Sequence, residues 1–133
     1  MQRTLPILFL AFSLLIGICA SAKDGAHLTE QNILIPTSDG ATLCAMIVRP
    51  SNASPLPAAL EFTIYVDPKK ALERLEYAAD RGYAGVMAYT RGKACSPQSA
   101  VPYEYDGRDA NTVIDWIAKQ PGSDGPALTD TEI

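Results

Sequence analysis

Apolar and polar residues fall into blocks along the chain, and the blocks from residue 58 onward predict a strand, a helix and a second strand. Residues 58–64 and 84–90 are two short, mostly apolar runs without clean alternation, as expected of strands that are covered on both faces. Between them, residues 68–81 have the periodicity of an amphipathic helix, with Leu72 and Leu75 on one face. Strand, helix and strand in this order predict part of a parallel α/β sheet.

Two further β-type runs, residues 32–36 and 41–49, precede this unit. They are joined by Thr37-Ser38-Asp39-Gly40, in which Asp and Gly tolerate the positive φ that a tight turn requires. We therefore expect an antiparallel hairpin that ends at Pro50.

A long loop and a second helix follow the second buried strand. Residues 91–105 have no periodicity, and loops of that length within a compact domain are often functional. Asp109 is the predicted N-cap of the next helix, because its carboxylate can accept from the free amides of the first turn. Trp116 lies beside the apolar stripe of this helix and is expected to pack on the sheet. The stripe consists of Ala110, Val113, Ile114 and Ile117.

The first 22 residues have the three parts of a secretory signal peptide: one positive charge, an apolar run from Leu5 to Ile18, and small residues at the end. Cleavage after Ala22 is the predicted outcome, with a periplasmic or secreted protein as the product. A membrane anchor and a lipid-modified Cys19 are the two alternatives. The apolar run is shorter than the roughly 20 residues that span a bilayer, so we expect no stable membrane insertion after cleavage.

Removal of this segment leaves 111 of the 133 residues, enough for one domain with a modest core. The formal net charge is −4 and the basic residues form no block, so nucleic acid is not an expected partner. Cys44 and Cys95 have no zinc-type spacing, and we expect no metal or other cofactor. In an exported protein they could form a disulfide, whereas a buried Cys44 thiol could equally act as a small hydrophobic residue.

An ordered set of short elements resembles a known family of enzymes. The set runs through Thr37-Ser38-Asp39-Gly40-Ala41-Thr42-Leu43, Arg49-Pro50, the strand ending in Tyr65, Gly82-Tyr83-Ala84, Thr90-Arg91-Gly92, and the helix from Asp109 through Asp115-Trp116-Ile117. In this order and spacing the elements resemble the N-terminal part of the X-prolyl dipeptidyl-peptidase and cocaine-esterase family of α/β-hydrolases. The resemblance covers residues 33–125.

This resemblance implies hydrolysis of a small ester or peptide substrate through a Ser-His-Asp triad. The family's serine stands on a Gly-x-Ser-x-x-Gly elbow, and a tyrosine hydroxyl contributes to the oxyanion hole. That tyrosine corresponds to Tyr65, the predicted catalytic residue in this chain. A phenol at the carboxyl end of a strand can donate to a developing oxyanion in the crevice of an open α/β sheet.

The resemblance ends at Asp124-Gly125, because residues 126–133 contain neither serine nor glycine. His27 is the only histidine and is expected to be a solvated residue ahead of the first strand. Ser96, Ser99 and Ser123 lack the flanking glycines of an elbow, and Cys95 lacks a histidine partner.

The sequence therefore predicts a signal peptide (1–22), the N-terminal part of a secreted α/β-hydrolase (23–125) and a divergent tail (126–133). Its fold would be an incomplete hydrolase sheet, in which an antiparallel hairpin is followed by parallel βαβα. The chain would be inactive because the triad is absent. We expect the tail to be unable to build a further strand. Both buried strands would then leave an unpaired apolar edge, which is a route to aggregation. We therefore expect the mature chain to fold only marginally.

The alternative hypothesis is a small periplasmic binding module that uses the 91–105 loop. Two tyrosines and two acidic residues at the end of this loop would supply its recognition surface: Tyr103, Tyr105, Glu104 and Asp106.

Overall fold

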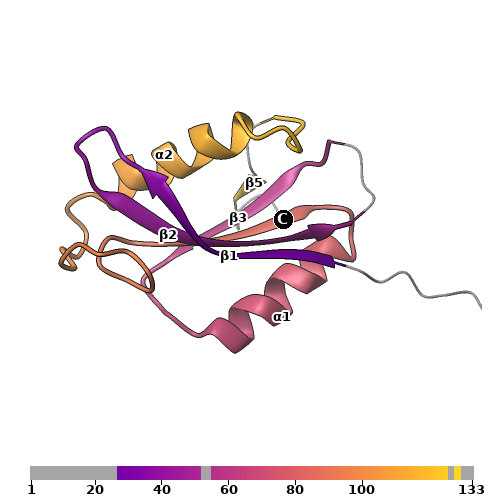
Figure 1. The fold of residues 1–133 in the computed structure, drawn as a ribbon, viewed down its shortest axis with the longest axis horizontal. Helices are drawn as coiled ribbons and strands as arrows, with labels where there is room; N and C mark the ends of the chain where they lie inside the picture. The colour runs from indigo at the N-terminus through magenta and orange to yellow at the C-terminus, as the bar shows by residue number, and fades with distance from the viewer. Residues whose placement is uncertain (1–26, 52–54, 126–127, 130–133) are drawn as a thin grey trace, which may run out of the picture.

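One mixed β-sheet with a helix on each face forms the fold in a computed structural model that describes residues 27–51, 55–125 and 128–129 (Figure 1). The predicted signal peptide lies outside the described residues. Neither helix in the described part of the chain is long and apolar enough to cross a membrane. In chain order the elements are β1 (His27–Pro36), β2 (Thr42–Pro50), β3 (Ala58–Thr63), α1 (Pro68–Ala79), β4 (Ala84–Tyr89), α2 (Asp106–Ala118) and β5 (Leu128–Thr129).

The predicted hairpin is confirmed, and its first strand is longer than expected. β1 and β2 pair antiparallel from Pro36 opposite Thr42 to His27 opposite Pro50, with a register shift between Glu30 and Ile33. Asn32 has a φ of 56° at this shift. The bulge breaks the alternation of residues, and the exposed side chains before it are mostly polar, so the hydrophobic pattern did not indicate that β1 begins at residue 27.

The predicted β3–α1–β4 unit is confirmed, with β3 and β4 parallel from Ala58 opposite Ala84 to Thr63 opposite Tyr89. At the start of α1, the Asp67 carboxylate accepts from the Lys70 amide at 3.1 Å, which satisfies one free donor of the first turn.

The strand order is β1-β2-β4-β3-β5, so β4 lies in the middle of the sheet between antiparallel β2 and parallel β3. The expectation that both buried strands would leave an open edge is therefore wrong for β4. Leu128 and Thr129 pair in parallel with Ala59 and Leu60. The tail thus does build a short strand, contrary to the sequence prediction, because backbone pairing with β3 does not require large apolar side chains.

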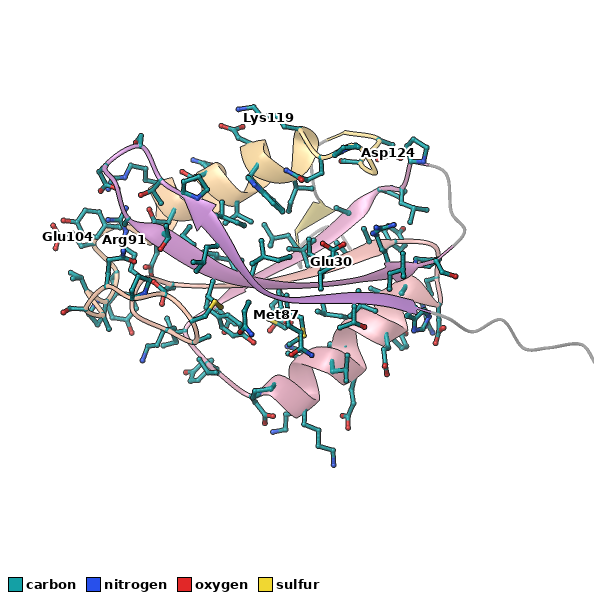
Figure 2. All side chains as sticks on the ribbon, viewed as in Figure 1. Glu30, Met87, Arg91, Glu104, Lys119 and Asp124 are labelled. Atoms are coloured by element: carbon teal, nitrogen blue, oxygen red, sulfur yellow. A yellow bond between two sulfur atoms is a disulfide. The ribbon has the colours of Figure 1, made fainter. Side chains whose placement is uncertain are left out.

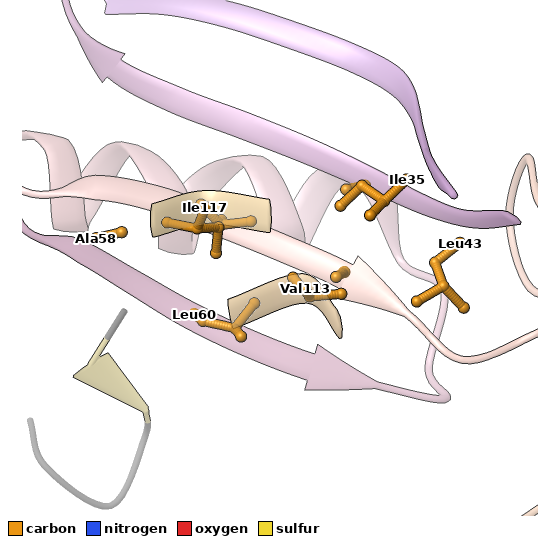
Figure 3. Close-up of a cluster of buried hydrophobic side chains, with 9 residues drawn as sticks. Ile35, Leu43, Ala58, Leu60, Val113 and Ile117 are labelled. Carbon is orange, nitrogen blue, oxygen red and sulfur yellow. The ribbon is translucent and has the colours of Figure 1, made fainter. Parts of the chain in front are cut away.

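Two apolar clusters lie on opposite faces of the sheet. The cluster on the α2 side joins Val113 and Ile117 to buried residues of four strands (Figure 3). Trp116 packs against this cluster, as predicted. The cluster on the α1 side joins Leu75 and neighbouring α1 residues to β2 and β4. The two helices therefore pack on opposite faces of β2 and β4, and α2 also packs on β3. The loops between elements emerge at the two ends of the sheet.

Candidate functional site

The carboxyl ends of β3 and β4 define one end of the sheet, and ligands of open α/β sheets bind outside such ends. β3 ends at Thr63 and β4 at Tyr89, directly opposite each other. Because β2 runs antiparallel to β4, the turn between β1 and β2 emerges at the same end. Figure 1 shows this turn and the 91–105 loop together at one end of the sheet. We call this end the carboxyl edge.

Arg91, two residues after β4, is the most heavily bonded side chain at the carboxyl edge (Figure 2). Its side chain is only 9% exposed. Nε and Nη2 donate to the two carboxylate oxygens of Asp109 at 2.6 and 2.8 Å. Nη1 and Nη2 donate to the carboxylate of Asp39 at 2.9 and 3.0 Å. One guanidinium thus joins the hairpin turn, the end of β4 and the first turn of α2.

Further contacts surround this ion-pair cluster. Arg108 Nη2 lies 2.6 Å from Asp39 Oδ2, and Thr37 Oγ1 donates to Asp39 Oδ1 at 2.5 Å. The Tyr105 ring lies beneath both guanidinium groups, with its centroid 4.2 Å from Arg91 Cζ and 4.9 Å from Arg108 Cζ. Stacking of guanidinium on an aromatic face adds cation–π attraction to the charged hydrogen bonds.

The cluster also shifts the pKa values of Asp39 and Arg91. Hydrogen bonding from Arg91, followed by the hydrogen bond from Thr37, holds the pKa of Asp39 far below its usual range. Hydrogen bonds to Asp109 and then Asp39 raise the pKa of Arg91 above its ordinary value. At neutral pH the arginine and Asp39 therefore stay charged.

Asp109 does not cap α2, contrary to the sequence prediction. The helix begins at Asp106 with Tyr105 at the N-cap position, and no side chain makes a capping hydrogen bond there. Asp109 lies within the first turn and is 1% exposed. Its carboxylate accepts two hydrogen bonds from Arg91, a partner 18 residues away that the local sequence could not reveal.

The 91–105 loop is anchored to the sheet close to its start. Cys44 of β2 and Cys95 of the loop form a disulfide, which decides between the two alternatives left open by the sequence. Ser96 is buried, and its hydroxyl donates to the Thr42 carbonyl at 2.7 Å and accepts from the Gly92 amide at 3.1 Å. Cys95 and Ser96 therefore have structural roles in this loop.

Tyr65, the predicted oxyanion donor, lies two residues beyond the end of β3 at the carboxyl edge. It is 79% exposed, and its amide donates to Thr63 Oγ1 at 3.1 Å. Beside it is a hollow of about 390 Å³ on the α1 side, which is also lined by the ion pair of Glu61 and Arg74. The phenol is available to a group bound outside the strand ends, and its catalytic role stays a prediction.

His27 is not a solvated residue ahead of the first strand, as the sequence suggested. It begins β1, its side chain is 22% exposed, and Nε2 lies 3.0 Å from Asp80 Oδ1. His27 pairs with Pro50 at the end of β2, and this places it at the end of the sheet opposite Tyr65.

The loop residues of the alternative binding-module hypothesis have different surroundings. Tyr103 is 80% exposed with a φ of 67°, whereas Tyr105 is held against the two arginines. Interaction with the neighbouring Glu104 carboxylate raises the pKa of the Tyr105 phenol above its usual value. Tyr105 thus belongs to the ion-pair cluster, which leaves Tyr103 as the tyrosine that the loop presents openly.

No role for Arg91 was predicted from the sequence, although Thr90-Arg91-Gly92 and Asp109 belong to the elements that resemble the family. The signal that could have pointed to it is an arginine directly after an apolar strand, where water is scarce. Such a charge requires carboxylate partners. Within the described residues, no three His, Cys, Asp or Glu side chains are grouped so that they could hold a metal ion.

Comparisons with known proteins agree on a family. Residues 39–127 match the model of the X-Pro dipeptidyl-peptidase (S15) family. The chain is 32% identical over 108 residues to cocaine esterase from Rhodococcus sp. (strain MB1 Bresler), an alignment that covers 77% of this chain and 19% of that enzyme.

Solved structures show the same fold. A CocE/NonD family hydrolase from Staphylococcus aureus matches with a TM-score of 0.66 and 20% identity, covering 77% of this chain and 22% of that one. An α-amino acid ester hydrolase matches with a TM-score of 0.67 and 24% identity, covering 90% and 24%. The chain thus spans about a fifth to a quarter of the length of these relatives. By the extent of the family match, this chain belongs to the X-Pro dipeptidyl-peptidase (S15) family.

Proposed function

We propose that this chain forms the amino-terminal part of the catalytic domain of an exported serine hydrolase that cleaves acyl esters or X-prolyl peptides. Family membership supports the reaction class. The observation that carries the proposal is the exposed phenol of Tyr65 just beyond β3, at the edge of the sheet where this fold binds ligands.

In this proposal Tyr65 donates a hydrogen bond to the oxygen that becomes negatively charged when the serine attacks the carbonyl. A donor that is already aimed at this position stabilises the transition state more than the ground state. The ion-pair cluster of Arg91 holds the hairpin turn and the start of the 91–105 loop in place. These segments at the carboxyl edge therefore do not have to become ordered during the reaction.

We also propose that the 133 residues do not hydrolyse these substrates by themselves. The only histidine, His27, pairs with Asp80 at the opposite end of the sheet and cannot reach a nucleophile beside Tyr65. The nucleophile, base and acid of the triad would come from residues that are not among these 133. The disulfide between Cys44 and Cys95 supports export, because such bonds persist in oxidising compartments.

A chimera tests this function directly. Residues 39–127 would replace the matching segment of the Rhodococcus cocaine esterase, and hydrolysis of p-nitrophenyl acyl esters and X-prolyl p-nitroanilides would be followed by absorbance. We expect the chimera to retain activity toward one of the two classes and the isolated chain to show none. A folded chimera without activity, or an isolated chain that hydrolyses either substrate, would contradict the proposal.

A further inference from the structure

A second hollow lies at the end of the sheet opposite Tyr65. Its volume is about 480 Å³, within the range of small-molecule sites, and it opens between the hairpin and the carboxyl-terminal end of α2. Its wall is mostly apolar and includes half-buried side chains whose exposed surface a ligand can contact: Ile33, Ile47, Leu56 and Trp116.

The bulge in β1 places a carboxylate over this apolar wall. Glu30 pairs with Ile47 and Ile33 pairs with Ala45, so that Gln31 and Asn32 together oppose a single residue of β2. In a regular strand Glu30 and Ile33 would point to opposite faces, because neighbouring side chains alternate. The extra residue brings both onto the α2 side, where Figure 2 shows Glu30 between β1 and the layer of α2.

Glu30 shares the mouth of the hollow with Arg49. The closest approach of the two side chains is 3.5 Å, longer than the 2.7–2.9 Å typical of charged hydrogen bonds. Their side chains are 53% and 37% exposed. Both groups therefore keep hydrogen-bonding capacity that an incoming ligand can use.

We propose that this hollow binds a small zwitterion with an apolar body, such as a free apolar amino acid. The ammonium group would bind the Glu30 carboxylate, and the ligand's carboxylate would accept two hydrogen bonds from the Arg49 guanidinium. In an α-amino acid the two charged groups are attached to the same carbon, which suits two opposite charges that lie side by side. The apolar side chain would then lie against Ile47 and Trp116.

The chemistry of the wall separates this ligand class from others. An inorganic ion would leave the apolar wall exposed to water, and an uncharged apolar molecule would leave Glu30 and Arg49 with only their loose pairing. The hollow is distinct from the carboxyl edge, so this binding does not depend on the proposed hydrolysis.

The single tryptophan of the chain makes the test direct. Trp116 lines the hollow, and no other tryptophan contributes to the fluorescence. The purified chain would be titrated with L-leucine, N-acetyl-leucine, leucinamide and glycine while its emission is recorded. We expect a saturable change with leucine at a Kd on the order of 1 mM. Each analogue lacks one charge or the apolar body and should bind about tenfold more weakly or worse.

Two variants identify the residues. Arg49→Gln and Glu30→Gln should each weaken leucine binding about tenfold, whereas Arg81→Gln and Glu73→Gln, on the α1 side of the molecule, should not change it. Circular dichroism and Tm would show that each variant keeps its fold. Absence of a saturable change with leucine, equal binding of N-acetyl-leucine, or unchanged binding by a folded Arg49→Gln variant would each overturn the proposal. The ligand series with the unaltered chain decides the matter even if a variant fails to fold.

Discussion

At the scale of single residues, Arg91 has the surroundings that a buried cation requires. Its guanidinium makes four hydrogen bonds to two carboxylates and lies over the ring of Tyr105. Burial of a charge is costly unless it is paired and hydrogen-bonded, and removal of one partner leaves that cost uncompensated. The residue that tests this most sharply is Asp109, which is almost fully buried.

Asp109→Asn should lower the free energy of unfolding by about 3 kcal/mol, because the substitution removes one of the two charges that neutralise Arg91. Urea unfolding at neutral pH measures the effect. Asp115→Asn is the matched control, since Asp115 is exposed on the same helix and should change stability by no more than about 0.5 kcal/mol. Equal stability of the two variants would show that the buried pair contributes nothing.

The pH dependence of Asp39 has a definite sign. Its pKa is lower in the folded chain than the value of about 3.9 in an unfolded one, so it stabilises the fold above that pH. This stability is lost as pH falls toward the folded pKa. The Tm of the unaltered chain should therefore exceed that of Asp39→Asn at neutral pH, and the difference should narrow below about pH 4. A difference that stays constant down to pH 3 would contradict the assignment.

At the scale of elements, the parts with strong periodicity could be predicted and the parts that depend on distant partners could not. β3, α1 and β4 were placed to within about two residues, because buried strands and an amphipathic helix leave a clear apolar pattern. The start of α2 was misplaced because an aspartate before an apolar stripe suits an N-cap as well as a buried ion pair. β1 was shortened because its first residues are polar and precede a bulge.

The candidate site could be predicted only in part, for the same reason. Family resemblance pointed to Tyr65 at the end of β3, and the structure places it two residues beyond that end. The contacts of Arg91 with Asp39 and Asp109 span 52 and 18 residues of sequence. They arise from the order of strands in the sheet, which local patterns do not encode.

The disulfide ties the 91–105 loop to β2 across 51 residues of sequence. In the chain-entropy account of cross-links, a loop of this length stabilises the fold by about 4 kcal/mol. The double variant Cys44→Ala/Cys95→Ala should lose roughly this amount in urea unfolding. Dithiothreitol should destabilise the unaltered chain to a similar extent and leave the variant unchanged. If dithiothreitol left the stability of the unaltered chain unchanged, the stabilising role of the Cys44–Cys95 disulfide would be contradicted.

Close packing of α1 on β4 depends on Gly85. A Cβ at this position would lie 2.9 Å from the Leu75 carbonyl oxygen and 3.0 Å from its Cα, and both are backbone atoms. Gly85→Ala should therefore destabilise the chain by about 1–3 kcal/mol in thermal or urea unfolding. Gly107→Ala is the control, because a Cβ there meets nothing within 4 Å in the first turn of α2 and should be neutral or slightly stabilising. Equal effects of the two substitutions would contradict the close contact.

At the scale of the whole molecule, the chain spans about a fifth to a quarter of the length of its relatives. Its parallel strands β3 and β4 lie inside its own five-stranded sheet. β4 has neighbours on both sides, whereas β3 is paired on its outer side only through Leu128 and Thr129 among the described residues. The two ends of the sheet differ in chemistry. Tyr65 and the Arg91 cluster lie at the carboxyl edge, and the hollow of Glu30 and Arg49 lies at the other end.

We propose that Tyr65 supplies the oxyanion donor of a serine hydrolase, and the kcat of Tyr65→Phe in the active chimera tests this role most directly. The substitution removes one hydroxyl and keeps the ring. We expect kcat for ester hydrolysis to fall by about 10²-fold or more with little change in KM, because the lost hydrogen bond acts in the transition state. Tyr77→Phe, at an exposed tyrosine on α1, should leave both constants unchanged. A folded Tyr65→Phe chimera whose kcat stays within about twofold of its parent would contradict the account.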